Sequence, residues 1–269
     1  MSATVGGRPT VTVVIPARMS STRYPGKPLA PILGLPMIEH VRRRIMLAGG
    51  VDSVVVATPD TAIMDVVAAA GGIGAMTKHS HVRCTERVVE AMEQRTADIV
   101  VIVQGDEPLV VPEVVQEVVR PLLEDPSLEC TNLLCPLESA ADRESPEVVK
   151  AACDLQGNVM FFTRSSIPCF RDKVEVPVYR QTGIMAFRSA FLKQYDAWSE
   201  TPLEKAESVD MLRILEHGHR IRGVVTNFIM LGVDRPSDVP TAERILRDDP
   251  AQHAIYQSTL YMSSAKSAS

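Results

Sequence analysis

Aromatic residues and long apolar runs are both scarce in this sequence. Phe, Trp and Tyr make up 4% of its 269 residues, so aliphatic side chains must form most of the core. No stretch of about 18 apolar residues occurs, and we therefore expect no membrane-spanning helix. The first residues also lack a charged segment followed by an apolar one, so no secretion signal is expected and the predicted location is cytoplasmic.

Cysteine is uncommon as well, at five residues. An odd number at irregular spacing does not suit a disulfide framework, and it favours reduced thiols in a cytoplasmic protein. The five are Cys84, Cys130, Cys135, Cys153 and Cys169.

Positive charge is in deficit overall but is concentrated at the N-terminal end. The net charge is -5, yet Met1–Arg44 holds seven basic residues against one acidic residue, which gives +6 there and leaves -11 for the other 225 residues. The negative total argues against binding to a nucleic-acid polymer. The local excess is compatible with a small anionic ligand near the N-terminus.

Short β-branched runs alternate with helical patterns in the first half of the chain. The expected strands are residues 11–15, 54–57 and 98–103, and the expected helices are 37–48, 62–70, 85–95 and 112–123. Strands that are apolar throughout indicate a parallel sheet covered by helices on both faces. The sequence therefore predicts the α/β class.

The second half is less regular. The expected strands of a mixed, subsidiary sheet are residues 132–137, 148–152, 159–163 and 182–187, and a further strand is 222–227. The expected helices are residues 204–217 and 240–247. No repeat or linker divides the chain, so we expect one domain over residues 1–262 and a flexible tail at 263–269.

A basic loop follows the first expected strand. The segment Arg18–Lys27 contains three bases, two serines, one threonine and one glycine, and no acidic residue. Fixed cations, hydroxyls and free backbone N–H groups suit a polyphosphate. The loop lacks the spacing of a Walker motif and of a dinucleotide-binding fingerprint. A solvated basic loop without a ligand is the alternative.

Two carboxylates also follow expected strands. Asp106 comes after residues 98–103, and Asp234 comes after residues 222–227. Ligands of parallel sheets bind at the carboxyl ends of the strands, so these two side chains are candidates to hold Mg²⁺ against a triphosphate. Each of them could instead cap a turn, and the residues alone leave both interpretations open.

Seven short segments of the sequence stand out as motifs that carry a family resemblance. They are Val14–Leu29, Thr85–Arg87, Val103–Pro108, Val149–Lys150, Arg164–Pro168, Pro202–Glu204 and Gly232–Asp234. In content and order they resemble the CMP-Kdo synthetases (3-deoxy-manno-octulosonate cytidylyltransferases), over residues 11–246. The resemblance implies a Rossmann-like α/β domain of the nucleotidyltransferase type, with CTP as a substrate, Mg²⁺ as the cofactor and a homodimer as the assembly.

The resemblance also implies roles for residues at matching positions. The triphosphate would be held by Arg18, Ser21, Arg23 and Lys27, and the nucleoside by Ala57, Thr58, Thr85 and Gln104. Asp106 and Asp234 would be metal ligands, and Arg164 would meet the acceptor's carboxylate. The implied reaction is attack of an acceptor oxygen on the α-phosphorus of CTP with release of pyrophosphate, for which Arg18, Lys27 and Asp106 are the expected catalytic residues.

The expected acceptor site departs from the family pattern. Gln181 and Met185 stand where the family has histidine and tyrosine, Asp210 and Met211 replace Glu-Gln, and Arg83 and Cys84 replace Ser-Gly. Fewer partners for hydroxyls and one more positive charge favour a small, more anionic acceptor, for example a phosphonate such as phosphonoformate. The expected acceptor-binding residues are Arg83, Arg164, Gln181, Met185 and Asp210.

Two other functions stay open. The first is an ordinary CMP-Kdo synthetase that makes a lipopolysaccharide precursor, in which these substitutions are drift. The second is a non-catalytic regulatory protein that binds CTP, although the presence of Arg18, Lys27, Asp106 and Asp234 argues against it. Pyrophosphate release from CTP with Kdo or phosphonoformate would distinguish the three.

Overall fold

A mixed sheet forms the centre of the molecule, which we describe from a computed structural model for residues 7–137, 139–172, 174, 176–228 and 230–264. The strands of this sheet are β1 (Val11–Pro16), β4 (Ser53–Thr58), β5 (Ile73–Met76), β6 (Ile99–Val103), β7 (Cys130–Pro136), β8 (Lys150–Cys153), β9 (Val159–Thr163), β10 (Tyr179–Arg188) and β11 (Arg222–Val225). Within the described residues they form nine strands in the order β11-β7-β10-β6-β1-β4-β5, with β8 paired to β10 and β9 to β8.

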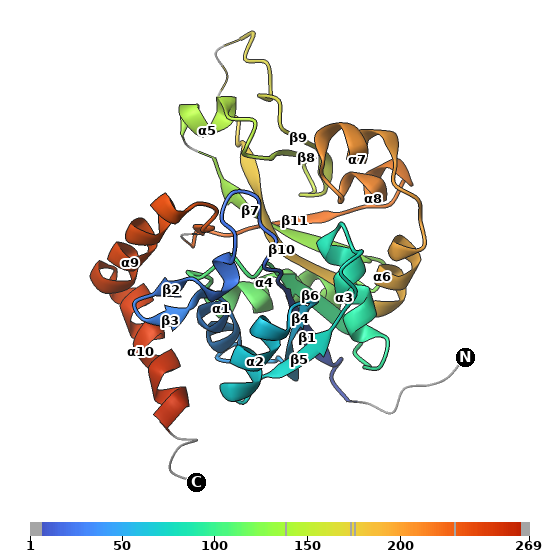
Figure 1. The fold of residues 1–269 in the computed structure, drawn as a ribbon. Helices are drawn as coiled ribbons and strands as arrows, with labels where there is room; N and C mark the ends of the chain where they lie inside the picture. Colours follow the sequence, from blue (N-terminus) through green and yellow to red (C-terminus); the bar gives the residue numbers. More distant parts are fainter. Residues whose placement is uncertain (1–6, 138, 173, 175, 229, 265–269) are drawn as a thin grey trace.

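Helices cover both faces of this sheet (Figure 1). They are α1 (Met37–Ile45), α2 (Thr61–Ala69), α3 (Cys84–Met92), α4 (Glu113–Glu124), α5 (Ala140–Glu144), α6 (Ser189–Asp196), α7 (Pro202–Glu207), α8 (Leu212–Glu216), α9 (Val239–Asp248) and α10 (Pro250–Ser264), with short 3-10 turns η1 (Lys27–Leu29) and η2 (Pro236–Asp238). The predicted α/β class is confirmed.

The first half folds as its continuously apolar strands predict. β1 pairs in parallel with β4 and β6, and β4 pairs in parallel with β5. Val13 and Ile15 pack in one core with residues of α1, α2 and α4, whereas Val14 packs in the other core with residues of α3, α6 and α8. Because both faces are buried, both sets of alternate positions are mainly apolar, and the few exceptions, such as Thr12, are small hydroxyl residues.

The strands expected in a subsidiary sheet join the central sheet instead. β10 lies antiparallel between β6 and β7, and β11 runs parallel to β7. The second sheet is a small hairpin of β2 (Pro31–Ile32) and β3 (Leu35–Pro36). Its turn places Leu33 and Gly34 at φ values of 47° and 82°, the left-handed conformation that two-residue hairpin turns require.

The single helix expected over residues 204–217 is two helices. α7 ends before Ser208, which adopts a left-handed φ of 54°, and α8 begins four residues later. This turn brings the guanidinium of Arg213 against the carboxylate of Glu204, with N–O distances of 2.7 and 2.6 Å. Charged residues recur every three positions across the break, which is why the sequence pattern predicts one helix.

The sequence pattern does not predict helix α10. Its buried face carries the polar residues Gln252 and Thr259, so no regular apolar stripe marks it. Gln252 accepts a hydrogen bond of 2.8 Å from the buried Arg44 and donates one of 3.0 Å to the Leu109 carbonyl. α10 extends two residues into the expected tail, whose remainder, 265–269, lies outside the described residues. Neither α10 nor any other helix in the described part of the chain is long and apolar enough to cross a membrane.

His40 joins helix α1 to the hairpin and to α10. Its Nε2–H donates to the Ile32 carbonyl at 2.8 Å, and its ring stacks on Tyr256 with 5.6 Å between centroids. Burial, only partly opposed by the bond to Ile32, lowers the pKa of His40 to about 4. The folded protein therefore keeps this ring neutral over a pH range in which the unfolded chain binds a proton.

We expect His40 to make the fold acid-sensitive. As the pH falls from the ordinary histidine pKa of 6.5 towards 4, the unfolded state takes up a proton before the folded state does. At about pH 4.5 this lowers the free energy of unfolding by roughly 2–3 kcal/mol relative to pH 7. In His40→Gln, which keeps an N–H for Ile32, that part of the loss should vanish. Urea unfolding of both proteins at the two pH values measures it, and equal losses would contradict the prediction.

Candidate active site

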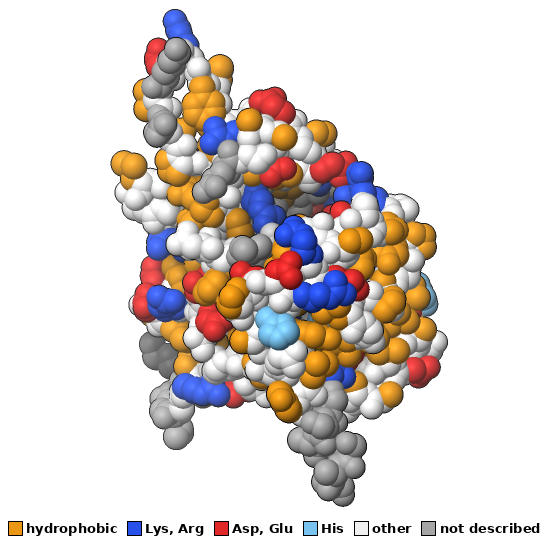
Figure 2. Space-filling model, turned by 90° about the vertical axis from the view of Figure 1, so that its left-hand side faces the viewer, with side chains coloured by type: hydrophobic (Ala, Val, Ile, Leu, Met, Phe, Trp, Pro, Cys, Tyr) orange, Lys and Arg blue, Asp and Glu red, His pale blue; other side chains and the backbone are white. Residues whose placement is uncertain are grey.

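A cavity of about 310 Å³, within the size range of small-ligand pockets, opens where β1 and β6 end. Of the predicted site residues it brings together Arg18, Ser21, Arg23, Lys27, Arg83, Gln104, Asp106 and Asp234. Figure 2 shows basic and acidic side chains next to one another around a hollow on one face of the molecule. The edge of the parallel sheet that the sequence predicts to bind ligand is thus the edge that carries the cavity.

The basic loop lines one wall of the cavity because its backbone is anchored. The Met19 N–H donates to Asp60 Oδ2 at 2.8 Å, and the Met19 carbonyl accepts from the Gly26 N–H at 2.9 Å. Gly26 has a φ of 74°, a conformation that suits glycine, and it caps the η1 turn, which begins at Lys27 and contains Pro28. Asp60 was not predicted from the sequence. Its position just after a strand, like that of Asp106, is the signal that would have found it.

Two cations of this loop contact the two predicted metal ligands. Lys27 Nζ lies 2.5 Å from Asp106 Oδ2 and 3.0 Å from Asp234 Oδ1, and the Lys27 side chain is only 13% exposed. Arg23 lies 2.9 Å from the same Asp234 oxygen and 2.8 Å from Glu147. Burial acts to lower the pKa of Lys27, but the charges and hydrogen bonds of Asp106 and Asp234 outweigh it and raise that pKa. The bridging amine is therefore an ammonium ion.

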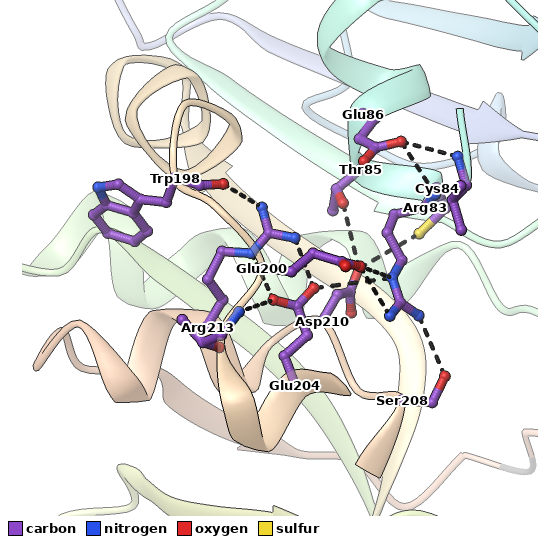
Figure 3. Close-up of polar contacts among 12 residues, drawn as sticks. Arg83, Cys84, Thr85, Glu86, Trp198, Glu200, Glu204, Ser208, Asp210 and Arg213 are labelled. Atoms are coloured by element: carbon purple, nitrogen blue, oxygen red, sulfur yellow. Dashed lines mark hydrogen bonds and ion pairs between the residues drawn. The ribbon is translucent and has the colours of Figure 1, made fainter. Parts of the chain in front are cut away.

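The N-terminal end of α3 contributes Arg83 to another part of the cavity lining (Figure 3). The Arg83 guanidinium donates to Glu200 at 3.2 and 3.3 Å and to the Ser208 hydroxyl at 3.3 Å. Glu204 lies 3.9 Å from Arg83, but it is fully buried and already pairs with Arg213. Arg83 is thus held by a partly exposed carboxylate through long bonds, beside a tighter buried pair.

Gln104 and Cys84 meet beside Arg83 in the cavity lining. Gln104 Nε2 donates to Cys84 Sγ at 3.0 Å, and Thr85 donates its hydroxyl to Asp210 Oδ2 at 3.3 Å. Burial raises the pKa of the Cys84 thiol to about 12, so this thiol is neutral and not a nucleophile. Burial also raises the pKa of Asp210, although Arg83 opposes the shift.

Several predicted residues do not line the cavity. Ala57 and Thr58, at the end of β4, and Thr85, in α3, are buried and are not among the lining residues. Their predicted contacts with a nucleoside stay predictions.

Four of the five predicted acceptor residues do not line the cavity either. Arg164 donates to the main-chain carbonyls of Glu207 and Pro146, at 2.7 and 2.9 Å. Gln181 donates to Asn132 at 2.8 Å, and Met185 packs in the core on the side of α3. Together with Asp210 they do not line the cavity, so of the five predicted acceptor residues only Arg83 faces it.

Two further residues are candidates that the sequence reasoning did not single out. Arg87 lines the cavity and donates to Thr77 at 2.5 Å and to the Lys78 carbonyl at 3.1 Å. Glu107 is buried next to Asp106, and its Oε2 has no hydrogen-bond partner among the described residues. Burial, strengthened by the charge of Asp106, raises the pKa of Glu107 to about 7. Both residues lie inside family-like motifs, and that is the signal that could have identified them.

The two carboxylates fit a divalent cation that needs further ligands. In the described part of the chain, no group of three His, Cys, Asp or Glu side chains gathers as a metal cluster. Mg²⁺ commonly binds one or two protein carboxylates and completes its shell with substrate phosphates and water. Asp106 and Asp234 suit that mode. Both carboxylates contact the same Lys27 amine, so they lie close together, and the basic loop lines the cavity beside them.

Gly183 of β10 sets the position of Gln104. A Cβ atom at residue 183 would lie 2.3 Å from Gln104 Cγ and 2.9 Å from Gln104 Cβ, distances that no real contact tolerates. The two residues are also joined by the bond from the Gln104 N–H to the Gly183 carbonyl, at 3.2 Å. Only glycine therefore lets Gln104 occupy the cavity wall as it does.

We expect Gly183→Ala to displace Gln104 and to weaken nucleotide binding. Overpacking of this kind costs about 1–3 kcal/mol of stability, so the protein should still fold. Gly232→Ala is the matched control, because a Cβ there would meet nothing closer than 3.7 Å. Calorimetric titration with CTP should show weaker binding for Gly183→Ala alone. Unchanged affinity would remove Gln104 from the nucleotide site.

The chain is similar to known proteins over most of its length. The family model described as "Cytidylyltransferase" matches residues 12–221. The 3-deoxy-manno-octulosonate cytidylyltransferase of Pelobacter propionicus is 43% identical over 248 residues, which is 88% of this chain and 97% of that protein. The enzyme of the same name from Geobacter metallireducens is 42% identical over 85% of this chain and 94% of its own. A solved CMP:2-keto-3-deoxy-manno-octonic acid synthetase complexed with CTP superimposes with a TM-score of 0.84, at 36% identity, over 88% of this chain and 98% of its own.

Proposed function

Because this chain belongs to the CMP-Kdo synthetase family of cytidylyltransferases, we propose that it transfers CMP from CTP to the sugar acid 3-deoxy-manno-octulosonate (Kdo) and releases pyrophosphate. The observation that supports this most is the cavity in which a basic loop, Gln104 and the carboxylates of Asp106 and Asp234 meet at the edge of the sheet. A nucleoside triphosphate and its metal ion require cationic groups and carboxylates in this arrangement.

Kdo takes precedence over the phosphonate expected from the sequence. The relatives named for Kdo share about two fifths of their residues with this chain over nearly their whole length. The substitutions at 181 and 185, which suggested a different acceptor, lie at residues that do not line the cavity. They therefore weigh less against a sugar acid than the sequence alone suggests.

The residues of the cavity divide the chemistry between them. Arg18 lines the cavity, is exposed and makes no ion pair with another described residue, so it is available to a phosphate group. Arg23 and Lys27 would bind the departing pyrophosphate, whose negative charge grows as the bond to the α-phosphorus breaks. A Mg²⁺ ion on Asp106 and Asp234 would supply positive charge at the α-phosphate. For in-line attack, the acceptor must then be held on the side of the α-phosphorus opposite the departing pyrophosphate.

The test of this function is pyrophosphate release from CTP and Mg²⁺ with each acceptor offered separately. Release that depends on Kdo, and formation of CMP-Kdo seen by mass spectrometry, is the expected result. Release with phosphonoformate and not with Kdo would overturn the acceptor. Binding of CTP without turnover of either would favour the regulatory protein.

Asp106→Asn should abolish turnover, because an amide cannot hold a divalent cation as a carboxylate does. We expect kcat to fall by roughly 10³-fold or more, which is about 4 kcal/mol of transition-state stabilisation. Asp52→Asn, a change in a carboxylate that pairs with Arg8 outside the cavity, is the control. Near-normal pyrophosphate release by Asp106→Asn, with an unchanged circular dichroism spectrum, would refute the assignment.

A small phosphonate stays as the second candidate because of Arg83. This residue adds a cation to the cavity where the family pattern has serine, and its bonds to Glu200 are long enough for an anionic acceptor to compete. Kinetics with both acceptors in the test above decide between the two.

A further inference from the structure

The ammonium of Lys27 occupies a cation position between two carboxylates. Its Nζ contacts Asp106 Oδ2 at 2.5 Å and Asp234 Oδ1 at 3.0 Å. The side chain is largely enclosed, whereas Asp106 and Asp234 are 29% and 41% exposed. Lys27 Nζ therefore bridges the two carboxylates from a more buried position, while both carboxylates also face the cavity.

A divalent cation on these carboxylates would compete with that ammonium. Lys27 binds one oxygen of each carboxylate, and Arg23 adds a second positive charge 2.9 Å from Asp234 Oδ1. A metal ion brought to the same pair would meet like charges at a few ångströms in a partly desolvated place, where repulsion is strong. The metal and Lys27 cannot both hold this pair in the arrangement seen.

A triphosphate offers Lys27 and Arg23 an alternative partner. Both residues belong to the loop that lines the cavity, together with Arg18 and Ser21. A triphosphate carries more negative charge in total than the two carboxylates, and its oxygens also supply the ligands that Mg²⁺ lacks here. Movement of the two cations onto phosphate would free both carboxylates at the moment when the remaining metal ligands arrive.

We propose that Lys27 is an exchangeable counter-ion that keeps the divalent cation out until CTP binds. The metal then enters with the nucleotide and not before it. The inference rests on one part of the proposed function, namely that a nucleoside triphosphate is the ligand that displaces Lys27. It does not depend on the acceptor. Weak metal binding could also follow simply from having two protein ligands, so the test must separate the two causes.

Titration with Mn²⁺ followed by electron paramagnetic resonance, without nucleotide or acceptor, makes that separation. Lys27→Met and Lys27→Gln remove the ammonium but leave both carboxylates, and we expect them to bind Mn²⁺ about tenfold or more tightly than the unaltered protein. Lys27→Arg keeps the charge and should bind as weakly as the unaltered protein. Arg18→Met removes a positive charge from the same cavity without vacating the bridging position, so it should also bind weakly.

The same series contains the results that would overturn the proposal. Mn²⁺ affinity of Lys27→Met and Lys27→Gln equal to that of the unaltered protein would do so. So would an equal gain in Arg18→Met, which would make the effect one of general charge. The gain in Mn²⁺ affinity must also disappear when Asp106→Asn is added to Lys27→Met; if it persists, Mn²⁺ binds elsewhere.

Thermal melting with and without Mn²⁺ shows that each variant is folded. Mn²⁺ should raise the Tm only in the variants in which Lys27 is replaced by an uncharged residue. Because no acceptor is present, this outcome is independent of whether Kdo is the substrate.

Discussion

The ion pairs that Lys27 makes with Asp106 and Asp234 join three segments that are far apart in the chain. The sheet places the first two segments, since β1 and β6 are parallel neighbours and end at the same edge. The third segment, after β11, is added through the hydrogen bond from the Val233 N–H to the Asp106 carbonyl, at 2.8 Å. The charges therefore close a cavity whose position the strand order has already determined.

The two groups of paired charges around the cavity differ in how firmly they are held. The pair of Glu204 and Arg213 is almost wholly buried and bidentate, and breaking such a pair leaves an uncompensated buried charge. Lys27, Arg23 and Arg83 pair with carboxylates that solvent reaches. The first group suits a rigid scaffold, and the second suits groups that change partners when an anion enters.

The sequence predicts most of the parallel half of the fold, and the six residues that it assigns to the triphosphate and the metal ion all line the cavity. Their binding roles stay predictions. The sheet is predicted correctly because β1, β4 and β6 are mainly apolar and β-branched, and because the carboxyl ends of parallel strands share one edge. The break at Ser208, the polar buried face of α10 and the placement of β10 depend on contacts between distant segments, which no local pattern contains. Arg164, Gln181 and Met185 do not line the cavity for the same reason: they are chosen by position in a motif, but their neighbours decide where they point. Their role in acceptor binding stays a prediction.

The insertion of β10 between β6 and β7 has a consequence for how the chain reaches this structure. β6 and β7 are close in sequence, yet each pairs with a strand that begins only at Tyr179. During synthesis, the edge of β6 therefore stays open while some 75 further residues emerge, and closing so long a loop is slow. An apolar, unpaired strand edge invites pairing with other chains. The nascent protein is thus exposed to aggregation until β10 has been synthesised, a vulnerability that the finished sheet conceals.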